Sequence, residues 1–235
     1  MQTDSINLVC ISYAGAGPSV FNGWADYLPS NFNLFCPGLA GKDKRFNEPA
    51  FKNINDSVND ITNSIINNCE LNKRTIIFGH SLGAILSYEV ARKLEKEYSS
   101  EQFHIVVCGS PGPTIKRKGK ASGLSDEDFC KEVEQIAGYR HPSFENPLLR
   151  ELLLPSLRAD VLMHESYNHV WTEKTNISIT CMFGNQDHVV SRDEALAWQD
   201  VTAGPLNVVV FDGGHMFWVE SVGSIINKII NIIHE

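Results

Sequence analysis

Ser81 stands at the centre of the sequence Gly-His-Ser-Leu-Gly, residues 79–83, and is the best candidate for a nucleophile. An apolar strand pattern, residues 74–79, leads directly into this sequence, and a long helical pattern, residues 82–97, leaves it. A G-x-S-x-G sequence between a strand and a helix predicts a sharp turn that exposes the serine. The glycines leave the turn room for a strained backbone, and the start of the helix directs its dipole and free amides at the serine oxygen.

A serine nucleophile needs a base, and the base needs a carboxylate that orients it. Of eight histidines, His215 fits best, because it follows a late strand pattern, residues 207–211, in a loop with two glycines. Asp187 follows the preceding strand pattern, residues 177–183, and comes 215 − 187 = 28 residues before the histidine. Functional groups of open α/β sheets gather at these carboxyl ends of strands. The chain order Ser, Asp, His therefore predicts a catalytic triad of Ser81, Asp187 and His215.

Other histidines and aspartates fit these roles less well. His80 lies inside the turn, where its side chain should point away from the serine and pack or support another catalytic residue. His188 adjoins the chosen acid and leaves no later loop to supply a carboxylate before it. Asp193 begins a helical pattern, which is typical of an N-cap, and Asp212 lies on the loop of the chosen base and would have to fold back. A surface-loop histidine and an ordinary capping serine remain the non-catalytic interpretations.

A run of small residues, 12–17, follows the first strand pattern and predicts an oxyanion hole. Its spacing matches neither G-x-x-x-x-G-K-[ST] nor a complete G-x-G-x-x-G, so a phosphate-binding loop is not indicated. Stabilising a tetrahedral intermediate takes two amide donors, one after the nucleophile and one from a loop after an early strand. We expect the amides of Leu82 and Ala14 to fill these roles, with Gly15 as the alternative second donor.

Strand and helix patterns alternate along the chain, which predicts an α/β protein with a mostly parallel sheet flanked by helices on both faces. The strand patterns cover residues 6–13, 33–36, 74–79, 104–108, 177–183 and 207–211. The helical patterns cover residues 19–28, 57–69, 82–97, 193–199 and 222–233. No linker divides the sequence, so residues 1–235 should form a single domain.

Residues 114–175 interrupt this alternation and predict a helical lid over the sheet. Their helical patterns cover residues 126–137, 147–154 and 157–167. Apolar residues of the lid are candidates to line an acyl pocket, although most must pack the lid itself. They are Leu124, Phe129, Ile136, Tyr139, Phe144 and Leu149, and we expect Tyr13, Gly15 and Met216 to join them from the sheet side.

Composition excludes several classes of protein. With 43% hydrophobic and 20% charged residues among 235, the chain is too apolar for disorder and long enough for a large core. Its net charge of −8 argues against nucleic acid as the main partner. The start of the sequence lacks the features of a signal peptide, and no apolar run is long enough to cross a membrane. Six cysteines without metal-binding spacing favour reduced core residues, so we expect a cytoplasmic protein without a metal site.

With these residues in place, the chain resembles the type II thioesterases, the stand-alone editing enzymes of polyketide and non-ribosomal peptide biosynthesis within the α/β-hydrolase superfamily. The resemblance covers nearly the whole chain, and its most specific parts are the entrance segment, residues 37–49 with Arg45, Glu48 and Pro49, and the lid run, residues 148–160. Further support comes from residues 11–16, 21–24, 79–83 and 213–217. Ser12 stands where the family usually has proline, and residues 39–41 depart from its Pro-Gly-Arg pattern, which leaves the acyl preference open.

The resemblance implies hydrolysis of acyl or aminoacyl thioesters carried on the phosphopantetheine arm of carrier protein domains, with no cofactor of the enzyme's own. The protein should be a monomer that binds neither nucleic acid nor membrane. A basic segment, residues 114–120, is a candidate docking site for an acidic carrier protein and equally fits a solvated loop. The alternatives are a serine carboxylesterase or lipase acting on small oxygen esters with the same triad, and a non-catalytic binding module on this fold.

Overall fold

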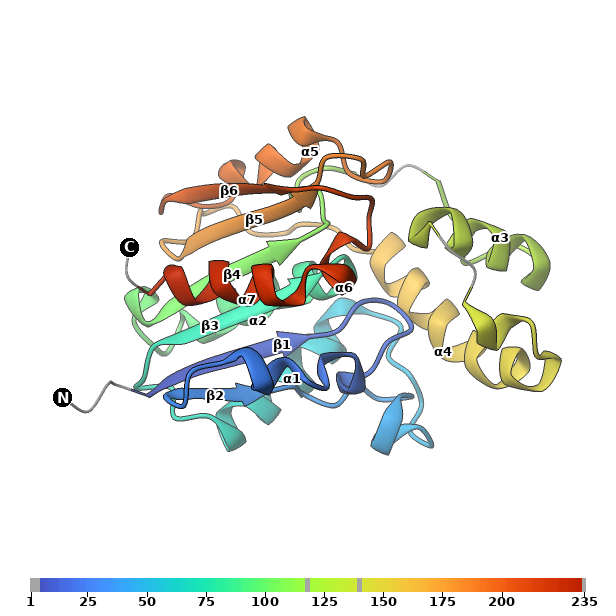
Figure 1. Cartoon of the computed structure of the whole chain (residues 1–235), viewed down its shortest axis with the longest axis horizontal. Coiled ribbons are helices and arrows are strands. Elements are labelled where there is room, and N and C mark those ends of the chain that lie inside the picture. Colours follow the sequence, from blue (N-terminus) through green and yellow to red (C-terminus); the bar gives the residue numbers. More distant parts are fainter. Residues whose placement is uncertain (1–4, 117–118, 139–140, 234–235) are drawn as a thin grey trace.

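The computed structural model describes residues 5–116, 119–138 and 141–233 (Figure 1). Within these residues six strands form one parallel sheet in the order β2-β1-β3-β4-β5-β6. They are β1 (Ile6–Ile11), β2 (Phe32–Phe35), β3 (Thr75–His80), β4 (Phe103–Cys108), β5 (Ser178–Gly184) and β6 (Leu206–Phe211). Each overlaps one strand pattern of the sequence, so the predicted α/β fold with a parallel central sheet is confirmed.

Helices cover both faces of the sheet, because successive strand side chains point to opposite sides. On β1, Val9 and Ile11 pack into the core beneath α1 (Ile54–Asn68) and α2 (Leu82–Leu94). Leu8 and Cys10 pack into the core on the other face, where α7 crosses in front of the strands in Figure 1. The remaining helices of the sheet layers are η1 (Pro18–Phe21), η2 (Trp24–Tyr27), η3 (Asp43–Arg45), η4 (Ser100–Gln102), α5 (Arg192–Leu196), η6 (Ala197–Asp200), α6 (Phe217–Glu220) and α7 (Val222–Asn231).

The strand order reverses between β1 and β3. β2 lies on one side of β1, whereas β3 and every later strand in the described sheet lie on the other side. Loops that leave adjacent strands at such a point diverge and open a crevice at the carboxyl ends of the strands. Ala14 follows β1 and Ser81 follows β3, so two of the predicted site residues flank this crevice.

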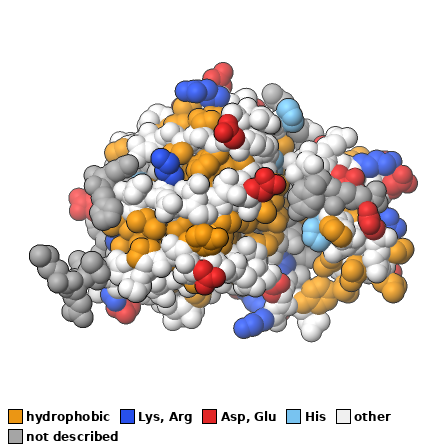
Figure 2. Space-filling view, in the orientation of Figure 1, with side chains coloured by type: hydrophobic (Ala, Val, Ile, Leu, Met, Phe, Trp, Pro, Cys, Tyr) orange, Lys and Arg blue, Asp and Glu red, His pale blue; other side chains and the backbone are white. Residues whose placement is uncertain are grey.

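Two helices form the lid between β4 and β5, beyond the carboxyl ends of the strands (Figure 1). They are α3 (Asp126–Ala137) and α4 (Pro147–Glu165), with the short η5 (Pro142–Phe144) between them. The lid has a small core of its own, which includes Phe129, Phe144 and Leu154. Figure 2 shows hydrophobic side chains on the surface of the lid as well, where Leu148 and Leu152 of α4 are exposed.

Three helical patterns of the sequence are divided differently in the structure. Residues 19–28 do not form one helix but the separate short helices η1 and η2, because Gly23 between them adopts the left-handed conformation with φ 83°. Residues 147–154 and 157–167, in contrast, belong mostly to one helix, since Pro155 lies inside α4 and does not end it. Proline removes one helical hydrogen bond, and the packing of α4 on both sides of Pro155 compensates for this loss.

Among the helices of the described ranges, none combines the length and apolar character needed to cross a bilayer. All six cysteines lie in these ranges, and none of them forms a disulfide. Five of them are buried, and Cys36 is partly exposed. The cysteines therefore pack as small apolar residues.

Candidate active site

Ser81 occupies a strained turn, the nucleophile elbow (residues 79–83), between β3 and α2. Its φ of 54° and ψ of −115° lie outside the usual regions for a residue with a side chain, at a cost of about 1–3 kcal/mol. The two flanking glycines make this turn possible. A Cβ at Gly79 would lie 2.0 Å from the carbonyl oxygen of Gly83, and a Cβ at Gly83 would lie 2.4 Å from that of Ile11. The Ser81 amide donates to the Cys108 carbonyl oxygen at 2.9 Å, which fixes the elbow to β4.

His215 and Asp187 are brought together from the loops after β6 and β5. The Nδ1 atom of His215 lies 2.9 Å from Oδ2 of Asp187. The other carboxylate oxygen, Oδ1, accepts the amides of Val189 at 2.8 Å and Val190 at 3.1 Å. Burial alone would raise the pKa of Asp187, but the hydrogen bond and charge of His215, helped by these amides, lower it. The ionised carboxylate therefore keeps a proton on Nδ1 of His215, which leaves Nε2 as the nitrogen that can exchange a proton with Ser81.

His80, inside the elbow, supports the main chain of His215. Its Nε2 atom lies 2.9 Å from the His215 carbonyl oxygen. Burial, reinforced by His215, lowers the pKa of His80 to about 3, so its ring is neutral near pH 7. Because a carbonyl oxygen only accepts, Nε2 carries the proton and donates it. The sequence predicted a packing or supporting role, and this contact shows what the ring supports.

Ser81 and His215 both lie on the wall of one cavity of about 510 Å³, a volume suited to a small acyl group. Of the residues predicted to bind substrate, five lie on its wall: Tyr13, Gly15, Ile136, Phe144 and Met216. Leu124 lines it too. The prediction for Phe129 is wrong, because its ring is fully buried inside the lid core, beneath the Arg158 guanidinium at 4.2 Å. Leu149 is exposed and lies away from the wall, and Tyr139 lies outside the described residues.

The sequence did not single out the cavity-lining face of α4. Leu153, Leu157 and Val161 project from it at intervals of four residues and line the cavity. Residues with this spacing share one face of a helix, so the signal was present. It was hidden because Pro155 suggested two separate helices.

The predicted oxyanion donors differ in what holds their amides. The Gly15 amide donates to Oδ2 of Asp160 at 2.7 Å, so it is engaged and the alternative donor is ruled out in this conformation. No hydrogen bond with another described residue takes up the amides of Ala14 and Leu82. Ala14 lines the cavity beside Ser81, and Leu82 begins α2. These two amides therefore remain the candidates for the oxyanion hole.

The basic segment, residues 114–120, borders this site through its last two residues, since Gly119 and Lys120 lie on the cavity wall. Lys116 and Lys120 are exposed. Arg117 and Lys118, which carry the rest of the predicted docking charge, lie outside the described residues.

The expectation that Asp193 caps the following helix was wrong. Ser191 caps α5 instead, because its hydroxyl accepts the Glu194 amide in a capping box.

Comparisons with known proteins agree with this geometry. A family model described as "Thioesterase domain" matches residues 6–233. Gramicidin S biosynthesis protein GrsT of Aneurinibacillus migulanus is 30% identical over 217 residues, which are 92% of this chain and 84% of that protein. Thioesterase PikA5 of Streptomyces venezuelae is 26% identical, over 96% of this chain and 80% of its own length.

Solved structures show the same architecture. The type II thioesterase BorB from the borrelidin biosynthetic cluster superposes with a TM-score of 0.85 at 26% identity, covering 97% of this chain and 93% of its own. ClbQ from the colibactin pathway has a TM-score of 0.89 over 98% of both chains at 23% identity, which supports the fold alone. Because the family model spans nearly the whole chain and the fold agrees, the chain belongs to the thioesterase domain family and is a serine hydrolase of the α/β-hydrolase fold that acts on thioesters.

Proposed function

We propose that the protein is a type II thioesterase that removes stalled or misprimed acyl and aminoacyl groups from the phosphopantetheine arm of carrier protein domains. The observation that carries this proposal is the common cavity: the strained Ser81 and the Asp187-bound His215 open onto one largely apolar space beneath the lid. The names of the similar proteins, among them a gramicidin S biosynthesis protein, support a role in polyketide or non-ribosomal peptide synthesis.

The chemistry follows from the placement of the side chains. His215 takes the proton of the Ser81 hydroxyl as Oγ attacks the thioester carbonyl, and Asp187 stabilises the imidazolium that forms. The amides of Leu82 and Ala14 bind the oxyanion of the tetrahedral intermediate. His215 then returns the proton to the sulfur of the leaving pantetheine thiolate. In the second half of the reaction His215 removes a proton from water as the water attacks the acyl-serine. His215 passes this proton to Oγ of Ser81 as the bond to the acyl group breaks, which releases the acid and restores the enzyme.

The proposed reaction uses side chains and main-chain amides of this chain, and the phosphopantetheine arrives on the partner. We therefore propose a monomeric enzyme without a cofactor or metal of its own, working in the cytoplasm beside a synthase. The basic segment, residues 114–120, is the proposed contact for an acidic carrier protein, since complementary charge raises the rate of encounter. Reversing the charge of Lys116, which lies away from the cavity wall, should then raise KM for carrier-bound substrate and leave KM for a small thioester unchanged.

The function is tested by exposing a panel of acyl-loaded carrier proteins to the enzyme and measuring the loss of acyl mass by mass spectrometry. Wild-type protein should release the acyl groups, and Ser81→Ala should fold normally but release none. p-Nitrophenyl esters provide the comparison for the carboxylesterase alternative. Rapid ester hydrolysis with no release from any carrier protein would favour that alternative, and an active Ser81→Ala variant would refute the mechanism.

A further inference from the structure

Asp160, in the middle of lid helix α4, is a buried carboxylate that the proposed reaction does not use. Its side chain is nearly inaccessible, with the residue 2% exposed. Each oxygen has one partner: Oδ2 accepts the Gly15 amide at 2.7 Å, and Oδ1 pairs with Nζ of Lys42 at 2.9 Å. Lys42 is itself only 6% exposed. Because a buried ion pair contributes little to stability, stability alone does not explain why Asp160 and Lys42 are buried together here.

The amide that Asp160 holds belongs to a tight turn, the oxyanion turn (residues 13–16). The Ala16 amide donates to the Tyr13 carbonyl oxygen at 3.0 Å, and Gly15 has a φ of 81°. These features define a type II turn, in which the middle peptide joins Ala14 to Gly15. The hydrogen bond to Asp160 fixes the direction of this middle peptide. It thereby anchors the turn to α4, and the turn carries the Ala14 amide one peptide before the one that Asp160 holds.

An apolar contact from the same helix reinforces this hydrogen bond. Leu157 lies one turn before Asp160 on α4 and packs against Gly15 so closely that a Cβ there would be 2.7 Å from its Cδ1 atom. Residues three apart on a helix share a face, so α4 presents both contacts to the turn together. The turn is therefore held by the lid and not only by the sheet.

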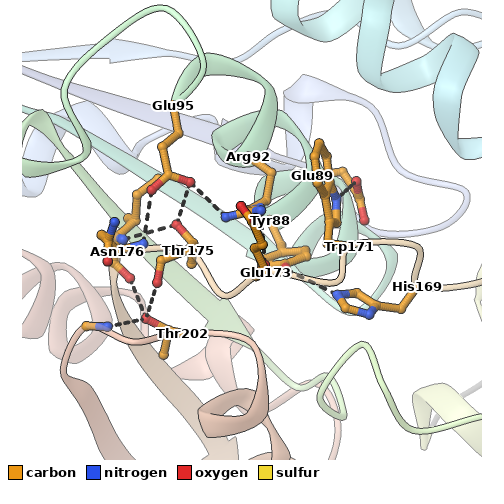
Figure 3. Close-up of polar contacts among 12 residues, drawn as sticks. Tyr88, Glu89, Arg92, Glu95, His169, Trp171, Glu173, Thr175, Asn176 and Thr202 are labelled. Atoms are coloured by element: carbon orange, nitrogen blue, oxygen red, sulfur yellow. Dashed lines mark hydrogen bonds and ion pairs between the residues drawn. The ribbon is translucent and has the colours of Figure 1, made fainter.

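The segment directly after α4 is anchored to the helix that begins after the nucleophile. Glu89 of α2 accepts a hydrogen bond from the Tyr167 hydroxyl at 2.6 Å and another from Trp171 Nε1 at 2.8 Å. Figure 3 shows how Glu89 and Trp171 meet, beside a second set of contacts from Glu95 to Thr175. α4 thus connects α2, whose N-cap is Ser81, to the oxyanion turn.

We propose that Asp160, paired with Lys42, is a positioning residue that holds the oxyanion turn in its reactive conformation and so makes the lid part of the catalytic framework. The inference rests on the proposed function in one respect, the role of the Ala14 amide as an oxyanion donor. Loss of a donor of this kind lowers turnover about 10²–10³-fold in a serine hydrolase. A turn that loses its anchor and moves keeps the donor in place for part of the time, so we expect a loss of about 10- to 100-fold.

Two double variants separate the hydrogen bond from the buried charges. Lys42→Met with Asp160→Asn removes both charges but keeps an oxygen that accepts the Gly15 amide. Lys42→Met with Asp160→Leu removes both charges and that acceptor, with the same branching and number of side-chain heavy atoms. The readout is the pre-steady-state burst of p-nitrophenyl acetate, an oxygen ester. Its amplitude counts folded active sites, and its rate constant measures acylation of Ser81.

We expect the Asn double variant to acylate within about threefold of wild type and the Leu double variant to be about 10- to 100-fold slower, both with burst amplitudes near that of wild type. Tyr167→Phe is the matched control, because it removes a partly buried hydrogen bond just beyond the end of α4 without touching the oxyanion turn. Its acylation rate should stay within twofold of wild type.

Equal acylation rates in the two double variants would overturn the proposal, as would a Leu double variant that loses amplitude but not rate. Should the Leu double variant not fold, Lys42→Met with Asp160→Ala replaces it, with the same expected loss. Hydrogen exchange of the Gly15 amide in wild type is a further test, and unprotected exchange would also overturn the inference. Because the ester assay needs no carrier protein, a wild type that acylates with the ester but ignores every carrier thioester refutes the proposed substrate and leaves the positioning test valid.

Discussion

Replacing Asp187 with asparagine changes one atom of the site and tests the logic of the triad. Two amides, from Val189 and Val190, donate to Oδ1 of Asp187, while Oδ2 faces Nδ1 of His215. In Asp187→Asn the two amides still require an acceptor, so the new carbonyl oxygen should take the place of Oδ1. The amide nitrogen then points at His215 and donates to Nδ1. This contact forces the ring proton onto Nε2, where it blocks proton transfer from Ser81.

The contacts of Asp187 set the size of the effect. For the ring to keep its reactive tautomer, the new amide must rotate and place its NH₂ against two N–H donors. That rotation sacrifices two hydrogen bonds at about 1–3 kcal/mol each, or about 2–6 kcal/mol in total. At about 1.4 kcal/mol per tenfold change in rate, acylation should slow by about 30- to 10⁴-fold. With the unreactive tautomer instead, a loss near 10⁴-fold is expected.

The assay is the burst of p-nitrophenyl acetate together with release of free thiol from an acyl-carrier protein. Asp193→Asn is the matched control, since Asp193 is exposed at the start of α5 and the same chemical change there should leave both rates as in wild type. Circular dichroism should show folded protein for both variants. If Asp187→Asn acylated within tenfold of wild type, His215 would not depend on Asp187 for its tautomer, and this assignment would be refuted.

Three further changes test other parts of the structure. Gly79→Ala should lower the free energy of unfolding by about 3 kcal/mol and abolish Ser81 labelling by a fluorophosphonate, because its Cβ would lie 2.0 Å from backbone oxygen. His104→Gln should flatten the pH dependence of stability: burial and the charge of Arg74 lower the pKa of His104 to about 4, so the unfolded chain takes up a proton from about pH 6.5 downward and the folded protein does not. In urea denaturation, the free energy of unfolding of wild type should fall between pH 6 and pH 4.5 more steeply than that of the variant. The difference in slope should be about 1.4 kcal/mol per pH unit. Arg45→Lys should cost about 1 kcal/mol in thermal unfolding, since the Arg45 guanidinium contacts both Glu48 and Asp60.

Controls and contrary results are specific to each of these changes. Gly123→Ala is the control for Gly79→Ala, because a Cβ at Gly123 meets no atom within 4 Å and should leave stability almost unchanged. Equal unfolding temperatures for the two glycine variants would contradict the steric account of the elbow. Parallel curves of unfolding free energy against pH for wild type and His104→Gln would contradict the second prediction. They would show that His104 takes up its proton equally in the folded and unfolded states. An Arg45→Lys variant as stable as wild type would mean that a single ammonium group stabilises the protein as much as the forked guanidinium does.

Local pattern was sufficient to predict the sheet and its flanking helices and to choose the candidate residues of the triad. Strand and helix periods follow from the backbone, so the alternation along the chain already indicated parallel strands with crossover helices. Ser81 could be chosen because only a turn flanked by glycines tolerates its geometry. Asp187 and His215 could be chosen because the carboxyl ends of parallel strands meet at one edge of the sheet, which brings their loops together.

Contacts between distant segments could not be read in this way. Gly15 and Asp160 are 145 residues apart and interact only because α4 lies against the oxyanion turn. The same packing decides that Leu157 faces the cavity while Phe129 is buried within the lid. It also keeps α4 continuous through Pro155, where local propensity favours a break. Periodicity shows that a helix has an apolar face, but not what that face meets.

The sequence by itself thus determined which groups can react, because reactivity depends on residue type and on the local geometry of a strand end or a glycine turn. Only the tertiary structure decided how those groups are held. The Asp160 carboxylate accepts the Gly15 amide, and the His80 ring donates to the His215 carbonyl oxygen. Each contact joins two segments that are distant in the sequence, and the local pattern of one segment says nothing about the other. Such contacts depend on the relative position of packed helices and loops, and this position is fixed by the burial of side chains from the whole chain at once.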